Sequence, residues 1–138
     1  MTRHVRKLRQ LLASMIKIAW GYNRFVLLFG NYVIKFPNIF NGERAFVVGQ
    51  NAIIREYELS LQAQNNNDHR LGYVYCRGWF GLFLIMKRYT HILNRELTNI
   101  EVQMLPIANP DLKIGNYAVE NNQIVVIDYG HSDCWYTG

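Results

Sequence analysis

Two short segments near the C-terminal end combine residue types that can perform phosphate chemistry. The first, Asp-Leu-Lys-Ile-Gly-Asn, runs from Asp111 to Asn116 and includes Lys113; the second begins at Asp128. Mg²⁺ prefers hard oxygen ligands and usually takes only one or two of them from the protein. A further carboxylate can orient an acceptor hydroxyl, while a cation offsets the charge that develops during phosphoryl transfer. The residues therefore predict a site for Mg²⁺ and phosphate.

The elements that must position these residues follow from hydrophobic spacing and turn signals. A Gly-Asn pair at 30–31 and an Asn-Asn pair at 121–122 are typical hairpin turns, each flanked by apolar residues. The order of elements predicts an α+β domain with a mainly antiparallel sheet. The expected strands are 24–29, 32–36, 71–76 and 80–87, the expected second helix is 43–64, and a hairpin is expected about residues 120–122, ending on Asp128.

The first part of the chain carries its excess positive charge. Residues 1–24 contain six Lys or Arg and no acidic residue, whereas the remainder contains nine basic and ten acidic residues. Apolar residues at helical spacing from Val5 to Ala19 predict an amphipathic helix over residues 4–19. We expect it to dock on the core with its basic side in solvent; binding to a membrane surface or an acidic partner is the alternative.

Composition excludes several classes of protein. Half of the 138 residues are hydrophobic, which argues against disorder. No apolar run reaches the roughly 18 residues of a membrane-spanning helix, and the N-terminus lacks the pattern of a secretory signal. Cys76 and Cys134 have no metal-type spacing, so we expect small apolar fillers in a reducing, cytoplasmic protein. Because the basic residues are confined to one segment, a nucleic-acid-binding surface is not expected.

The two C-terminal segments resemble motifs of the protein-kinase family. Asp111, Lys113 and Asn116 match the spacing of its catalytic loop, Asp-Leu-Lys-x-x-Asn. Asp128-Tyr-Gly is similar to its metal-binding Asp-Phe-Gly motif, with Tyr in place of Phe. The resemblance implies Asp111 as the catalytic base, Lys113 as a γ-phosphate contact, and Asn116 and Asp128 as Mg²⁺ ligands.

The upstream sequence is similar to the same family in the same order. Lys35, in Tyr-Val-Ile-Lys, resembles the strand lysine that holds the α- and β-phosphates of ATP, and Glu56 resembles its partner on the following helix. Glu58 lies about 200° around the helix from Glu56, so only one of the two can face Lys35. The resemblance also implies a strand and hinge that receive adenine, at Met86, Lys87 and Arg88.

Each of these residues also has an ordinary structural explanation when taken alone. Asp111 after a proline could form a turn or a helix cap, and Asn116 could end a loop. Lys35 could be an edge-strand lysine, and Glu56 a solvated helix residue. The combination of motifs in order favours the kinase-like interpretation.

The expected fold is therefore a truncated protein-kinase-like fold: an antiparallel-sheet N-lobe with a helix over residues 1–88, and a much reduced C-lobe over 89–138. The sequence departs from the family at Asn109-Pro110, where His-Arg is usual, and in a glycine-rich loop reduced to Gly21 and its neighbours. Since only eight residues follow Gly130, we expect no helices for a peptide substrate. The expected function is a minimal Ser/Thr-type kinase using ATP and Mg²⁺ on a protein substrate; the alternative is a pseudokinase-like module that regulates a partner.

Overall fold

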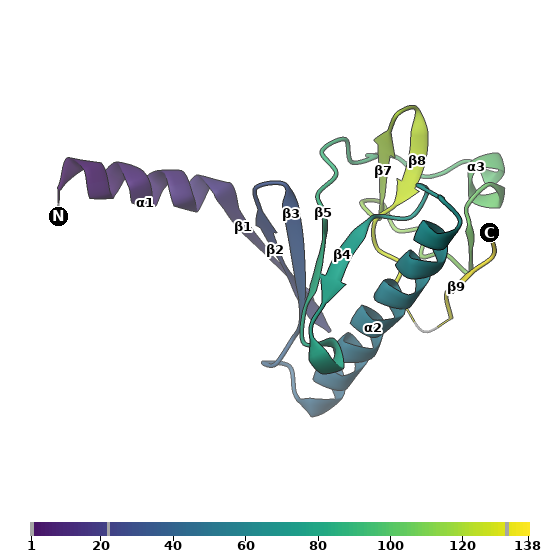
Figure 1. The fold of residues 1–138 in the computed structure, drawn as a ribbon, viewed down its shortest axis with the longest axis horizontal. Helices are drawn as coiled ribbons and strands as arrows, with labels where there is room; N and C mark the ends of the chain where they lie inside the picture. Colours follow the sequence, from purple (N-terminus) through teal and green to yellow (C-terminus); the bar gives the residue numbers. More distant parts are fainter. Residues whose placement is uncertain (1, 22, 132) are drawn as a thin grey trace.

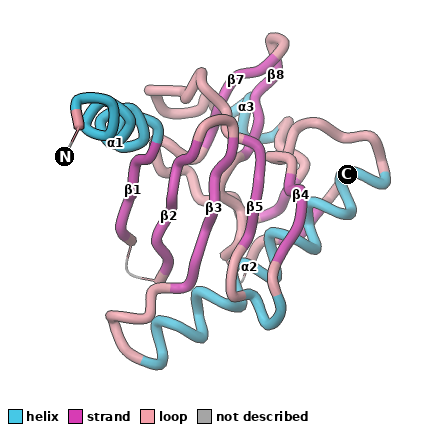
Figure 2. Tube along the Cα trace, turned by 60° about the vertical axis from the view of Figure 1, so that its left-hand side comes forward, coloured by secondary structure: helices cyan, strands magenta, loops and turns pink. Residues whose placement is uncertain are grey.

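The computed structural model describes residues 2–21, 23–131 and 133–138, and it has an α+β architecture. A five-stranded antiparallel sheet in the order β1-β2-β3-β5-β4 is covered on one side by the long helix α2 (Figures 1 and 2). Two shorter strand pairs, β6–β9 and β7–β8, form the second part of the molecule. The expected α+β class and mainly antiparallel sheet are confirmed.

The hairpin of β2 (Arg24–Phe29) and β3 (Tyr32–Pro37) forms as its turn sequence predicts. Gly30 has φ +56°, a left-handed conformation that glycine adopts without steric cost. The register pairs Val26 with Lys35, which fixes the lysine opposite the middle of β2. The hairpin thus sets the depth at which the Lys35 side chain enters the molecule.

The expected helix over residues 4–19 is only partly correct. Helix α1 spans Arg3–Met15, and the next residues form strand β1 (Ile16–Trp20), which pairs with β2. The free edge of β2 offers a row of backbone hydrogen-bonding groups, and this long-range pairing overrides the local helical spacing.

The docking of this helix on the core is also not observed. In Figure 1, α1 extends away from the rest of the molecule. Val5 and Leu8 are 43% and 56% exposed, so the apolar side of the helix faces solvent. The side chains of residues 12–16, some of which belong to the same predicted apolar side, lie outside the part of the chain that the structure describes.

Helix α2 (Glu43–Asn65) matches the predicted range closely, and its buried face packs on the sheet. Residues at helical spacing are buried along this face, including Ile53 and Leu59 in addition to Glu56. Gly49 allows close approach: a Cβ there would lie 2.2 Å from the carbonyl oxygen of Asn23. Helix α2 therefore packs directly against Asn23, the residue before β2.

The second strand pair is shorter than predicted. Strand β4 (Val74–Arg77) and strand β5 (Leu84–Lys87) are separated by a short 3₁₀ turn, η1 (Trp79–Gly81). Phe80 in this turn has φ +57°, which a strand cannot accommodate, so the predicted strand from residue 80 begins only at Leu84. Strand β5 lies between β3 and β4, as its apolar sequence predicts.

The remaining elements are short. Helix α3 (Asn99–Gln103) begins with a capping box between Thr98 and Glu101. Strands β7 (Tyr117–Glu120) and β8 (Gln123–Val126) form the predicted hairpin, with Asn121 and Asn122 both at positive φ. Strand β6 (Ile107–Ala108) pairs with β9 (Trp135–Tyr136), a pairing that the sequence analysis did not predict.

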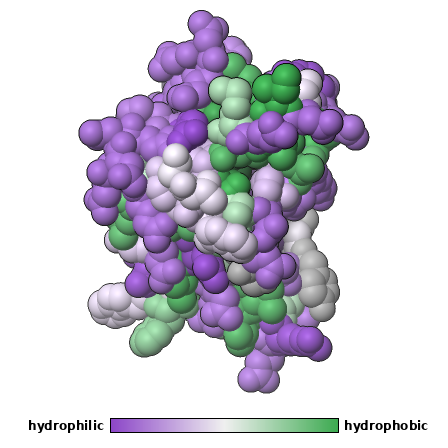
Figure 3. Space-filling model, turned by 90° about the vertical axis from the view of Figure 1, so that its right-hand side faces the viewer, coloured by the Kyte–Doolittle hydropathy of each residue, from purple (hydrophilic) through white to green (hydrophobic). Residues whose placement is uncertain are grey.

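Two buried clusters form the core. One lies between α2 and the sheet and contains Ile53, Leu84 and Met86. The other lies beneath the C-terminal elements and includes Tyr129 and Cys134. Cys76 is exposed, so the expectation of two buried fillers holds only for Cys134. The surface in Figure 3 is largely hydrophilic with separate hydrophobic patches. Among the described residues, no helix is long and apolar enough to cross a membrane.

Candidate active site

A buried ion pair joins the central strand to the long helix. Both carboxylate oxygens of Glu56 accept hydrogen bonds from Nζ of Lys35, each at 3.0 Å. Lys35 is 5% exposed and Glu56 is 0% exposed, whereas Glu58 faces the surface. The predicted pairing of Lys35 with Glu56 is therefore confirmed as geometry, because β3 and α2 pack directly against each other.

Arg24 belongs to the same cluster and was not recognised in the sequence. Its Nη1 donates to Oε1 of Glu56 at 3.1 Å, and its Nη2 donates to Oδ1 of Asp128 at 2.6 Å. The side chain of Arg24 is 16% exposed. The one feature of the sequence that could have identified Arg24 is its position, directly after the loop in which the resemblance places the glycine-rich segment.

Asp128 receives positive charge from two sides. Arg24 and Lys35 lie 2.6 and 3.7 Å from its Oδ1. Burial alone would raise the pKa of Asp128, but Lys35 and Arg24 lower that pKa well below its ordinary value. Burial likewise opposes a charge on Arg24, yet Glu56 and Asp128 raise the pKa of its guanidinium. Both groups therefore remain ionised throughout the physiological range.

The backbone of the Asp-Tyr-Gly segment is fastened to this cluster. The backbone N–H of Tyr129 donates to Oε1 of Glu56 at 3.2 Å, and the Tyr129 hydroxyl donates to the carbonyl oxygen of Gly72 at 2.7 Å. Tyr129 is 0% exposed, and burial raises the pKa of its hydroxyl well above the ordinary value. Gly130 packs so closely on α2 that a Cβ would lie 2.4 Å from the carbonyl oxygen of Ala52. These contacts explain how a buried tyrosine takes the phenylalanine position of the motif.

A cavity of about 390 Å³ opens in front of the cluster, between strands β2, β3 and β5 and the loop before β7. Its volume falls in the range of small-molecule sites, roughly 300–1,000 Å³. Apolar side chains from β2 and β3 form one wall. The cavity brings together most of the predicted nucleotide and metal residues, namely Lys35, Met86, Lys87, Arg88, Asn116 and Asp128.

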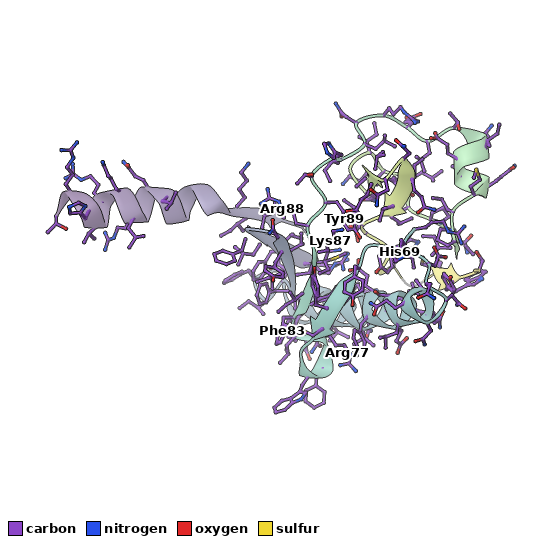
Figure 4. The ribbon with its side chains drawn as sticks, turned by 45° about the horizontal axis from the view of Figure 1, so that its top comes forward. His69, Arg77, Phe83, Lys87, Arg88 and Tyr89 are labelled. Atoms are coloured by element: carbon purple, nitrogen blue, oxygen red, sulfur yellow. The ribbon has the colours of Figure 1, made fainter. Side chains whose placement is uncertain are left out.

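The predicted hinge residues have contacts of their own. Figure 4 shows Lys87, Arg88 and Tyr89 together at the end of β5. The backbone N–H groups of Lys87 and Arg88 donate to the carbonyl oxygens of Tyr73 and Asn31, at 2.8 and 2.9 Å. The Lys87 side chain forms an ion pair with Glu120. Those two N–H groups are therefore engaged within the protein, and the next residue, Tyr89, also lines the cavity.

The loop before β7 is held by its own hydrogen bonds. The carbonyl oxygen of Asp111 accepts from Nδ2 of Asn116 at 3.3 Å and from the Tyr117 hydroxyl at 2.7 Å. Burial, followed by the charge of Asp111, raises the pKa of Tyr117 to about 12. The carboxylate of Asp111 accepts the backbone N–H of Lys113 at 3.1 Å, the turn contact that an aspartate after proline can make.

A second cavity, of about 660 Å³, contains Asp111 and lies on the other side of Asp128. Asp128 lines both cavities, so it stands where they meet. Arg24, Glu58 and His131 also line the second cavity. Lys113 differs from the other predicted residues: it is exposed and is not among the described residues that line either cavity.

The oxygen donors in the first cavity fit Mg²⁺. Asn116 and Asp128 both line it, and Mg²⁺ typically takes one or two carboxylates plus substrate phosphates rather than a complete protein cage. Within the described ranges, no group of three His, Cys, Asp or Glu could hold a metal ion alone. The ammonium of Lys35 beside these oxygens supplies the charge that a phosphate would need.

Comparison with known proteins supports the fold. No protein-family model and no curated protein sequence matches the chain. The structure is similar to the streptomycin–ATP–APH(2″)-IIa ternary complex, with a TM-score of 0.57 and 14% identity over 99% of this chain and 73% of that chain.

Two structures of WbdD are also similar. The complex with kinase inhibitor LY294002 has a TM-score of 0.49 and 15% identity, over 86% of this chain and 32% of that one. The bifunctional kinase-methyltransferase WbdD has a TM-score of 0.49 and 14% identity, over 84% and 31%. This chain spans about a third of the length of either. With the strand order and the similarity to the APH(2″)-IIa complex, the chain has the protein-kinase-like fold.

Proposed function

We propose that this chain is an ATP- and Mg²⁺-dependent phosphotransferase that acts on a hydroxyl acceptor. The observation that carries the proposal is the buried Lys35–Glu56 pair beside Asp128, at the rim of a cavity that also contains Asn116. A lysine kept in place by a buried carboxylate is suited to hold phosphates in one position, which is the main requirement of phosphoryl transfer. Residues 1–88 and 89–138 would form the two lobes around this cavity.

Each residue would have a separate role. Lys35 would contact the α- and β-phosphates, with Glu56 as its positioning residue, and the segment Met86–Tyr89 would receive the base. Asn116 and Asp128 would hold Mg²⁺, which neutralises charge on the phosphates when it is bound. Asp111 would orient the acceptor hydroxyl from the second cavity. The bipartite arrangement, with Asp128 between the two cavities, supports this division between nucleotide and acceptor.

The finer assignment is a Ser/Thr-type protein kinase in the cytoplasm. The Ser/Thr assignment rests on Lys113, which matches the lysine of the protein-kinase catalytic loop, and the cytoplasmic location rests on the two free cysteines. Lys113 would have to turn toward the second cavity when an acceptor binds. If Lys113 does not turn toward this cavity, the acceptor for the same residues is the hydroxyl of a small molecule.

A second candidate function is a binding module that regulates a partner, and the exposed α1 favours it. This helix has apolar residues in solvent beside a set of basic residues, as surfaces that bind partners commonly have.

The two functions predict opposite effects of mutation. Asp111→Asn should leave ATP affinity unchanged and lower transfer by about 10²–10⁴-fold, because a general base acts on the acceptor. Asp128→Asn should weaken binding of the Mg²⁺–ATP complex itself. Asp133→Asn, an exposed aspartate, is the matched control. Calorimetry with Mg²⁺–ATP and phosphate transfer from radiolabelled ATP measure the two steps.

Absence of ATP binding at millimolar concentration would refute the proposed site. Retention of full biological activity by both aspartate variants, together with its loss on charge reversal of Arg6, Lys7 and Lys17, would establish the binding module instead.

A further inference from the structure

Arg24 contacts Asp128 from the side of the second cavity, which both residues line. Its two terminal nitrogens divide between two carboxylates: Nη1 bonds to Glu56 at 3.1 Å and Nη2 bonds to Asp128 at 2.6 Å. The 2.6 Å contact is short for a charge-assisted hydrogen bond, which places the guanidinium directly against a carboxylate oxygen.

The backbone at Gly21, Asn23 and Arg24 is held by hydrogen bonds that do not involve the Arg24 side chain. The carbonyl oxygen of Arg24 accepts the N–H of Gly21 at 2.8 Å, and the carbonyl oxygen of Asn23 accepts the N–H of Asn38 at 2.7 Å. Nδ2 of Asn38 also donates to the carbonyl oxygen of Gly21 at 2.7 Å. Helix α2 closes the space behind this segment at Gly49.

We infer that Arg24 is a built-in counterion that a divalent cation must displace from Asp128. The inference rests on the proposed function. A doubly charged ion at Asp128 would stand a few ångströms from the guanidinium, and like charges at that distance in a half-buried site repel strongly. Because Glu56 is bonded through the other nitrogen, Nη2 can leave Asp128 while Nη1 keeps Glu56. A phosphate in the adjacent cavity is then an acceptor for the released nitrogen.

Arg24 therefore couples metal binding to nucleotide binding. Without nucleotide, the metal competes with the guanidinium for Asp128 and binds weakly. With nucleotide, the displaced guanidinium gains a phosphate oxygen, and the competition is relieved. Charge-assisted hydrogen bonds of this kind correspond to a factor on the order of ten in affinity.

The test is titration of the full-length protein with Mn²⁺, a spectroscopic substitute for Mg²⁺, with and without ATP. Arg24→Gln should bind Mn²⁺ alone about tenfold more tightly than the wild type, and ATP should increase its Mn²⁺ affinity less. Arg24→Lys, which cannot bridge two carboxylates, should fall between them. Arg44→Gln, at an exposed arginine of α2, should behave as the wild type.

Three results would overturn the inference in distinguishable ways. Equal Mn²⁺ affinity of Arg24→Gln and the wild type, with loss of binding in Asp128→Asn, refutes the role of Arg24 and keeps the metal site. If Arg24→Lys binds Mn²⁺ with the affinity of the wild type, the positive charge at this position is sufficient, and the bridging of two carboxylates by Arg24 is refuted as the cause. No Mn²⁺ binding by any variant, even with ATP, refutes the proposed function together with the inference.

A different observation, the exposure of α1, carries a second inference. Val5 and Leu8 are 43% and 56% exposed although they lie on one side of the helix. At 100° per residue, Arg3, Arg6 and Lys7 lie on the other side, and Arg9 lies at the border beside Val5. The first acidic residue of the chain is Glu43. The helix thus separates an apolar side from a basic side, with no negative charge nearby in the sequence.

We propose that α1 lies on an anionic phospholipid surface. Such a surface provides both requirements at once: negative headgroups for the basic side and an acyl boundary for the apolar side. A nucleic acid would leave the apolar side in water, and a second copy of the helix would bring like charges together. Figure 1 shows that α1 extends from the end of the sheet, where a planar surface can reach it.

Co-sedimentation with vesicles tests this proposal. The full-length protein should bind phosphatidylcholine vesicles that contain phosphatidylglycerol and should not bind phosphatidylcholine alone. The Arg6→Glu/Lys7→Glu double variant should bind at least tenfold more weakly, since each basic residue near such a surface adds to the attraction and each acidic one opposes it. Leu8→Ser should also bind more weakly. Arg44→Glu and Ile100→Ser, at exposed residues elsewhere, should bind as the wild type does.

Two results would refute the membrane surface. Equal binding to both kinds of vesicle, or full binding by the Arg6/Lys7 variant, excludes recognition of anionic lipid by α1. Failure of the wild type to bind either vesicle excludes it as well and makes an acidic protein surface the partner that fits the helix.

Discussion

Replacement of Glu56 by glutamine tests how the site and the fold depend on each other. Glu56 is 0% exposed and accepts hydrogen bonds from three groups: Lys35 through both oxygens at 3.0 Å, Arg24 at 3.1 Å and the backbone N–H of Tyr129 at 3.2 Å. Glutamine has the same shape but no charge, and its amide nitrogen would point a donor at the Lys35 ammonium. Two cations would then share the single remaining carboxylate, Asp128.

The loss of stability expected for Glu56→Gln follows from the burial of Glu56. Removal of one member of a buried ion pair destabilises a protein by about 3–5 kcal/mol, because the remaining charge is left without compensation. In a chain of 138 residues, that loss corresponds to a fall of about 10–20 °C in the melting temperature. The total stability of a domain is only about 5–15 kcal/mol, so the variant should fold but remain marginal.

The measurement is urea and thermal unfolding of Glu56→Gln beside Glu58→Gln. Glu58 is the matched control because it lies two residues away on the same helix and is exposed. Its substitution should change the free energy of unfolding by no more than about 0.5 kcal/mol. Equal stabilities of the two variants would refute the reasoning, since they would mean that the buried cluster contributes no more than a surface carboxylate.

Three further predictions concern parts of the fold outside this cluster. The hydrogen bond from Arg70, against an opposing effect of burial, lowers the pKa of Asp68 to about 2. The stabilisation that the ionised Asp68 carboxylate provides should be complete above its unfolded pKa near 4 and lost as the pH falls toward 2; an Asp68→Asn variant whose stability shows the same acid dependence as the wild type would contradict this. Gly49→Ala should destabilise the protein and loosen the segment about Asn23, because its Cβ would meet the Asn23 carbonyl oxygen at 2.2 Å; an unchanged melting temperature would exclude that contact. Leu84→Ala should cost about 2–5 kcal/mol in urea unfolding, because Leu84 is 0% exposed in the core; a cost below 1 kcal/mol would show that the site collapses around the smaller residue.

Local sequence determined the elements whose signals lie within a few residues. The Gly30-Asn31 and Asn121-Asn122 pairs predicted both hairpins, because turn geometry depends on the conformations that those residues can adopt. The spacing of apolar residues predicted α2 within two residues, since one face of a helix must be buried. The order of the kinase-like motifs indicated the fold, which the structural similarity supports.

Tertiary structure decided the features that depend on distant partners. Residues 16–19 follow the predicted helical pattern but lie in strand β1, because the edge of β2 is available to pair with them. The exposure of the apolar residues of α1 does not follow from residue type, since it depends on what packs nearby.

Arg24 illustrates the difference most clearly. It is an ordinary strand residue in the sequence, yet 104 positions separate it from Asp128, which it contacts. Residue type and spacing determined which groups could do phosphate chemistry. Only the packing of β2, β3 and α2 around Glu56 determined that the Arg24 guanidinium lies between Glu56 and Asp128. Two cations and two carboxylates in such a cluster are stable only when each charge faces an opposite one.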